Sequence, residues 1–199
     1  MQTALDHFEE NLSRARALAG LAHSLSELTT EAIDLTDILR ATLVLSVSAL
    51  DQFVHDFVRL GMLEVHQGTR PTTDAHLSFK VTLGSVQTAL ADTGRDDWLD
   101  EAIRDTHGWA SFQHPEKIAA AVRLMSSAQL WDEVASQLGS TSLAVKTQLS
   151  AIVDRRNKIA HEADADPTNP GHRWPIDEIL VGDALGFLDS VGHAIFAVA

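Results

Sequence analysis

Apolar residues recur at helical spacing along most of the chain, and this pattern predicts helices throughout. The first predicted helix covers about residues 3–28, with an apolar stripe formed by Phe8, Leu12, Ala15, Leu18 and Leu21 or Ala22. The second opens at Glu31 and covers about residues 31–60. It is apolar over more than one face, which indicates a helix buried by neighbours on several sides. Strand signals are nearly absent, so the sequence predicts an all-α fold.

Residues 61–140 break this pattern into shorter pieces. Gly61 and Pro71 mark a predicted loop that extends to about residue 74. Short helices are then predicted at about residues 77–91, 97–105, 115–125 and 128–138. Thr93 and Gly94 end the first of these, and Pro115 is the expected first residue of the third. We interpret residues 61–140 as a helical insertion in a single domain of residues 1–199.

Two further long helices follow the insertion. One covers about residues 140–165, with Ser140 or Thr141 at its N-cap and an apolar stripe of Val145, Leu149, Ile152, Val153 and Ala160. A loop at 164–174 follows, and Pro175 is predicted to begin the last helix. The resulting order is long helix, long buried helix, insertion, long helix, loop and closing helix.

The helix at 140–165 carries the most distinctive polar pattern in the chain. Arg156 falls on its apolar stripe, where a guanidinium is costly unless another group pairs with it. Asn157 and His161 are four residues apart, so they share an adjoining face of the helix. The segment therefore combines an arginine, a following polar residue and a histidine five positions after the arginine.

Arg156, Asn157 and His161 resemble the R-x4-6-H signature of HEPN domains (higher eukaryotes and prokaryotes nucleotide-binding), in which a polar residue is favoured after the arginine. The helix order is also similar, and the chain resembles in particular the RiboL-PSP-HEPN branch. Many members of this group are metal-independent endoribonucleases that act as dimers with their two motifs facing each other. The resemblance implies a HEPN-like four-helix core, an RNA substrate and a homodimer. It also suggests a bacterial toxin–antitoxin or phage-defence role, with an antitoxin such as a nucleotidyltransferase as a possible partner.

The resemblance also implies roles for the three motif residues. RNA is cut when its own 2′-OH attacks the adjacent phosphate, which requires a proton acceptor, a proton donor and a cation for the phosphorane charge. His161 suits either proton role, and two copies in a dimer fill both. Arg156 offers a fork of donors to the phosphoryl oxygens, and Asn157 orients His161 or binds the phosphate.

Four neighbouring residues are expected to support the motif or to bind RNA. Asp51 lies in the buried helix, where HEPN proteins often have a carboxylate, and is expected to pair with the motif arginine or to orient its histidine. Arg155, Lys158 and Glu162 flank the motif in sequence. The predicted loop at 164–174 begins within one helical turn of the motif. Its residues His172, Arg173 and Trp174 therefore either reach over the motif or form a plain connector.

Structural roles remain open for these residues. Asp51 is alternatively an exposed edge residue, and Arg156 is alternatively half of a buried ion pair with Asp51 or Glu162. His161 is alternatively a hydrogen-bonded structural histidine. The corresponding alternative function is a non-catalytic HEPN-fold module that binds nucleotides, RNA or a protein partner.

Composition narrows the function classes. The chain has 199 residues and no cysteine, which excludes thiolate metal sites and cysteine nucleophiles, and it has no signal-peptide pattern. Asp51 and His55 lack a third metal ligand, so we expect no metal or other cofactor. The apolar run at 41–50 is too short to span a membrane, and we expect a cytoplasmic protein. A formal net charge of −13 argues against broad binding to a nucleic-acid backbone, although a basic focus at the motif suits one or two phosphates.

Overall fold

The computed structural model describes residues 1–30, 33–91 and 97–199, and this part of the chain forms nine helices. The helices are α1 (Gln2–Leu28), α2 (Thr36–His66), α3 (Asp74–Leu77), α4 (Leu83–Ala91), α5 (Asp97–His107), α6 (Pro115–Val122), α7 (Leu130–Gln137), α8 (Ser142–Glu162) and α9 (Glu178–Val198). Within the described residues, Ala165 and Arg173 form an isolated antiparallel β-bridge, and no strand is present. The predicted all-α fold is therefore confirmed. The expected helix start at Glu31 and the expected helix end at Thr93 and Gly94 lie outside the described residues.

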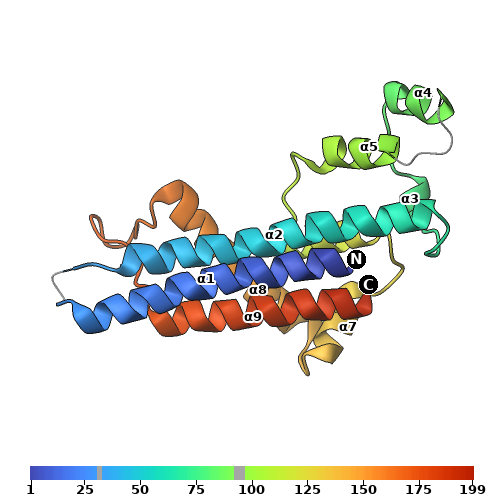
Figure 1. Ribbon diagram of the computed structural model, residues 1–199. Helices are drawn as coiled ribbons and strands as arrows, with labels where there is room; N and C mark the ends of the chain where they lie inside the picture. The colour runs from blue at the N-terminus through green and yellow to red at the C-terminus, as the bar shows by residue number, and fades with distance from the viewer. Residues whose placement is uncertain (31–32, 92–96) are drawn as a thin grey trace.

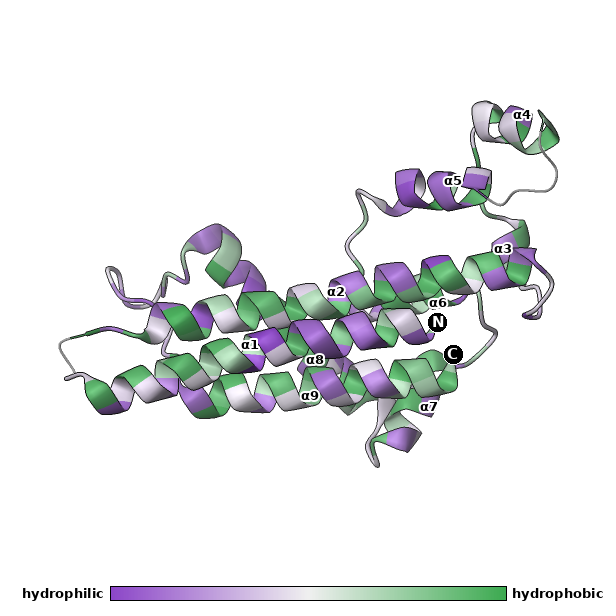
Figure 2. Ribbon diagram, viewed as in Figure 1, coloured by the Kyte–Doolittle hydropathy of each residue, from purple (hydrophilic) through white to green (hydrophobic). Residues whose placement is uncertain are grey.

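Four long helices form the core. Helices α1, α2 and α9 lie side by side, and the N- and C-termini lie at the same end of this bundle (Figure 1). Helix α8 packs against α2 through the fully buried Leu149 and Val153. The core is built largely on α2, whose Leu50, Phe53 and Phe57 are buried, as its apolar pattern predicts. Figure 2 shows apolar segments that recur along the same helix between polar ones.

Helix α2 runs past the loop that the sequence predicts at Gly61. The helix continues to His66, and Gly61 is buried within it. A Cβ atom at this position would overlap the side chain of Met125, which follows α6. The glycine therefore allows the insertion to pack closely against α2, and the prediction that it breaks the helix is wrong.

The insertion consists of two structurally different parts. Helix α4 projects from the bundle near the C-terminal end of α2 and packs on α5, whereas α5 and α6 pack against α2 and α7 packs against α8 and α9 (Figure 1). The predicted helix at 77–91 is divided, because Thr82 caps a new helix through its side-chain oxygen, which accepts from the Ser85 N–H (3.1 Å). Between α5 and α6 the chain returns along α2, where the Phe112 N–H donates to Asp51 (2.6 Å).

The predicted start of the last helix at Pro175 is wrong. Helix α9 begins at Glu178, and Asp177 caps it by accepting from the Leu180 N–H (2.8 Å). The backbone carbonyl of Pro175 accepts instead from the Arg155 guanidinium (3.1 Å), which holds this segment outside the helix. The predicted N-cap of α8 is confirmed, since Thr141 caps this helix by accepting from the Ala144 N–H (3.2 Å).

Helices α2 and α9 have the length and apolar composition of membrane-spanning helices. Both pack within the bundle, where α2 contacts α1, α8 and α9. Core helices of water-soluble bundles meet the same criterion, because burial on several sides also demands an apolar surface.

His107, the last residue of α5, makes folding stability depend on pH. The side chain is buried between Phe79 and Phe112. Burial lowers the pKa of His107 because it penalises the imidazolium, and nearby His55 lowers the pKa further. As the pH falls, the unfolded chain therefore takes up this proton first, and the folded state loses stability relative to it.

We expect the free energy of unfolding to fall between about pH 7.5 and about pH 5.5, and we expect His107→Phe to reduce that fall. Phenylalanine keeps the aromatic contacts and removes the titrating group. Urea unfolding of both proteins at the two pH values measures the difference. An identical fall in the two proteins would show that His107 does not contribute.

Candidate functional site

Helix α8 ends abruptly just after the motif. Ala163 and Asp164 both adopt left-handed backbone conformations, with φ of 50° and 57°, and the Asp164 N–H donates to the Lys158 carbonyl (2.9 Å). Such a conformation costs roughly 1–2 kcal/mol at a residue other than glycine, so surrounding contacts must hold it. His161 consequently lies in the last turn of the helix.

Those contacts come from a buried charge cluster of Arg40, Arg155 and Asp164. The Asp164 carboxylate is fully buried, and its Oδ2 accepts from Arg40 Nε (2.7 Å) and Arg155 Nη2 (2.9 Å). Both arginines also donate to the Trp174 carbonyl, at 2.9 Å and 3.1 Å. The cluster thereby joins α2, α8 and the loop at 163–177. Burial lowers the pKa of Arg155, Asp164 opposes this shift, and Arg40 adds to it.

Arg156 lies on the neighbouring side of α8 and contacts the insertion. Its Nη2 donates to the side-chain carbonyl of Gln113, a buried residue between α5 and α6. The Gln113 Nε2 donates in turn to Asp51 Oδ2 on α2 (2.8 Å). The expected direct pairing of Asp51 with the motif is therefore replaced by a bridged one, because Gln113 lies between the two charged side chains. Glu162 is exposed and is not the partner of Arg156.

His161 is exposed, and Asn157, one turn before it, is half-buried. Within the described residues, neither side chain makes a hydrogen bond to another protein group, so both are available to a ligand. Lys158 lies with its Nζ 5.2 Å from the centre of the Trp174 ring, at cation–π distance. Trp174 thus reaches the motif helix, whereas Arg173 binds Asp34 (2.8 Å) at the start of α2.

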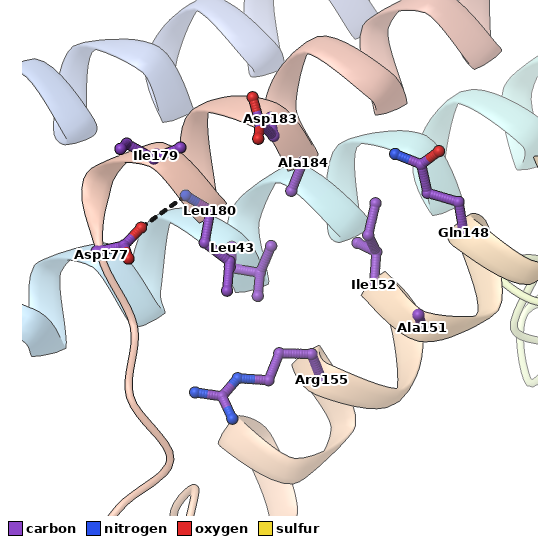
Figure 3. Close-up of a pocket in the computed structure, with 10 residues that line it drawn as sticks. All are labelled: Leu43, Gln148, Ala151, Ile152, Arg155, Asp177, Ile179, Leu180, Asp183 and Ala184. Atoms are coloured by element: carbon purple, nitrogen blue, oxygen red, sulfur yellow. Dashed lines mark hydrogen bonds between the residues drawn. The ribbon is translucent and has the colours of Figure 1, made fainter.

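Two grooves flank α8. An apolar groove of about 530 Å³ lies between α8 and α9, with Arg155 at one end (Figure 3). A second groove, of about 500 Å³, lies between α8 and the start of α6. It is lined by His114, Pro115, Glu116, Lys146, Thr147, Ser150, Ala151 and Asp154.

The second groove lies on the same face of α8 as the motif histidine. Asp154 and Ser150 precede His161 and Asn157 by seven residues, which is about two helical turns. The groove therefore leads along α8 toward those two side chains. The apolar groove contains Arg155 and lies on another face, so we take the second groove as the candidate substrate path.

The basic residues of α8 differ in how far their charge is neutralised. Lys146 pairs with Glu116 (3.4 Å), and Arg155 shares the buried aspartate. Arg156 contacts a neutral amide carbonyl, and Lys158 contacts an aromatic ring. In the parts of the chain that the structure describes, these last two cations near the motif have no carboxylate partner.

Three residues of this region escape sequence reasoning. Gln113 and His114 belong to the insertion, where no pattern singles them out, and nothing in the sequence distinguishes Asp164 from the other acidic residue of its loop. Sequence spacing identifies residues on one helix face but not residues that a loop brings to it. Among the described residues, no three histidine or acidic side chains are grouped as metal ligands.

A bundle of this helix order, with an arginine, a polar residue and a histidine at the end of its third long helix, is consistent with a HEPN domain. The match to a family model is specific: the chain belongs to the RiboL-PSP-HEPN family, whose model covers residues 9–195. HEPN domains are commonly ribonucleases or RNA-binding domains. Neither a curated protein nor a solved structure gives a significant match to the chain.

Proposed function

We propose that the protein is a metal-independent endoribonuclease of a toxin–antitoxin or phage-defence type. The observation that carries the proposal is the contrast at the end of α8 between paired and unpaired groups. His161 is exposed with an unbonded imidazole, and Arg156 is held by a neutral carbonyl instead of a carboxylate. A structural histidine and a structural ion pair would both have protein partners.

The proposed reaction exchanges one P–O bond for another and requires two proton transfers. One imidazole accepts the proton of the ribose 2′-OH as that oxygen attacks the adjacent phosphorus. A second imidazole, protonated, donates to the 5′ oxygen as its bond to phosphorus breaks. The products are a 2′,3′-cyclic phosphate and a free 5′-OH. Arg156 stabilises the extra negative charge on the phosphoryl oxygens, and Asn157 orients the imidazole or the phosphate.

Helix geometry favours a homodimer for this chemistry. Arg156 and His161 are five residues apart, so their side chains leave α8 about 140° apart around its axis. One chain also has one His161, whereas the reaction uses a proton acceptor and a donor. A two-fold axis near the end of α8 would bring a second His161 and a second Arg156 to the same phosphate.

The limited positive charge near the motif favours a second candidate, a non-catalytic module that binds RNA, nucleotides or an antitoxin. The formal net charge is −13, and Arg155 and Lys146 are neutralised by acidic partners. Such a module would bind a short segment or a protein partner, not a long nucleic-acid backbone.

Cleavage of a mixed tRNA and mRNA pool in the presence of EDTA tests the proposal. We expect wild type to cut RNA and leave 2′,3′-cyclic phosphate ends. His161→Ala should lower the rate by about 100-fold or more with unchanged thermal unfolding. Arg156→Ala should lower it as much, with unfolding that is still cooperative but at a lower temperature, because the buried Gln113 carbonyl loses its donor. The exposed His7, on α1, provides a matched control as His7→Ala. RNA binding without cleavage by a folded dimer would favour the binding module instead.

A further inference from the structure

Gln113 is a buried side chain that joins the motif arginine to α2. Its exposed fraction is 7%, and both ends of its amide are used. The Nε2 donates to Asp51 and the Oε1 accepts from Arg156. The residue belongs to the segment between α5 and α6, so the insertion contributes directly to the neighbourhood of the motif.

The orientation of this amide is determined by its two neighbours. A carboxylate accepts hydrogen bonds and a guanidinium only donates them, so the amide NH₂ must face Asp51 and the amide oxygen must face Arg156. Asp51 is itself held in place by the Phe112 N–H (2.6 Å). In a flipped amide, the NH₂ group would face the N–H donors of Arg156 and the carbonyl oxygen would face the acceptor oxygens of Asp51.

We propose that Gln113 is a positioning residue for Arg156 and that Asp51 acts on Arg156 through it. This inference rests on the proposed function for its catalytic consequence, but the coupling itself does not depend on catalysis. An amide carbonyl directs the guanidinium without cancelling its charge, whereas a carboxylate in direct contact would cancel it. The relay thus leaves Arg156 both ordered and cationic for a phosphate.

The alternative is that the three residues simply fasten the insertion to the bundle. The two possibilities differ at Arg156. A fastening role predicts that substitutions change the free energy of unfolding alone. The relay predicts that a substitution at Asp51, which does not touch Arg156, also changes the chemical reactivity of the Arg156 guanidinium.

Chemical modification of arginine by phenylglyoxal, followed by mass spectrometry, measures this behaviour directly. In Gln113→Leu and in Asp51→Asn we expect Arg156 to react about three-fold faster or more than in wild type, because its Nη2 loses an ordered partner. The buried Arg40 in the same sample serves as an internal reference. Asp56→Asn, on the same helix but outside the relay, is the matched control and should leave the rate unchanged.

The double variant with Asp51→Asn and Gln113→Glu provides a rescue. The asparagine NH₂ donates to one oxygen of the new carboxylate, and the other oxygen accepts from Arg156, so all donors and acceptors are matched again. Arg156 should return to slow modification. Its charge is now neutralised, so RNA cleavage should remain low, with a raised KM.

Cleavage assays then show whether the coupling matters for the reaction. Gln113→Leu and Asp51→Asn should each lower kcat by about ten- to a hundredfold through misplacement of Arg156, with unfolding still cooperative. Wild-type rates of Arg156 modification in Asp51→Asn would overturn the relay. If modification changes but wild type cuts no RNA, the relay stands and the proposed function fails.

Discussion

An equimolar mixture of wild-type and His161→Ala chains, unfolded and refolded together, is expected to retain about a quarter of wild-type RNA cleavage. Random pairing makes about a quarter of the dimers wild type on both sides, and about half carry one variant chain. If two imidazoles act on one phosphate, a mixed dimer lacks either the acceptor or the donor and is nearly inactive. Activity should then follow the square of the wild-type fraction.

The shape of this dependence separates two arrangements of the site. If each motif worked alone, every wild-type chain would keep its activity and the mixture would retain about half. A series of mixing ratios distinguishes a squared from a linear dependence, and sedimentation of each mixture verifies that dimers form. Mixing with His7→Ala chains, whose substitution lies on α1, should leave activity unchanged. A linear dependence would remove the shared-imidazole mechanism while leaving the ribonuclease proposal intact.

The four long helices could be predicted from the sequence because helix formation leaves a local, periodic record. Leu149 and Val153 fall at the spacing that any helix with one buried face requires. The motif on α8 could be recognised in the sequence for the same reason, since Asn157 and His161 are separated by one helical turn. Both conclusions depend on residues that are close in sequence.

What could not be predicted depends on contacts between distant segments. The sequence predicts that Gly61 breaks a helix, whereas in the structure it allows Met125 to pack against the helix. Asp51 is the expected carboxylate, but Gln113 lies between it and Arg156. Gln113 belongs to a loop, and no periodic pattern predicts where a loop residue lies. The sequence predicts that Arg155 supports the motif or binds RNA, whereas in the structure it pairs with the buried Asp164. In each case the deciding partner lies 9 to 64 residues away in the chain.

Asp164→Ala is expected to cause the largest loss of stability among single substitutions near the site, about 3–5 kcal/mol. The side chains of Arg40 and Arg155 are only 8% and 17% exposed, and Asp164 is the carboxylate they share. Its removal leaves Arg155 close to Arg40 without their shared carboxylate, and Arg40 keeps only the exposed Asp37, at 3.7 Å. The loss of the buried counter-charge costs more than the contact itself contributes.

The backbone conformation of Asp164 requires a second variant to separate charge from strain. Its φ of 57° is left-handed, a region that asparagine tolerates well. Asp164→Asn therefore keeps the backbone and an acceptor oxygen but removes the charge, and we expect it to lose somewhat less stability than alanine. Urea unfolding measures both, with the exposed Asp183→Ala on α9 as a control that should change stability by less than about 0.5 kcal/mol. A loss below about 1 kcal/mol in both variants would show that the cluster is dispensable for folding. A loss of the predicted size would show that the end of α8, and with it the position of His161, depends on a carboxylate that lies outside the motif.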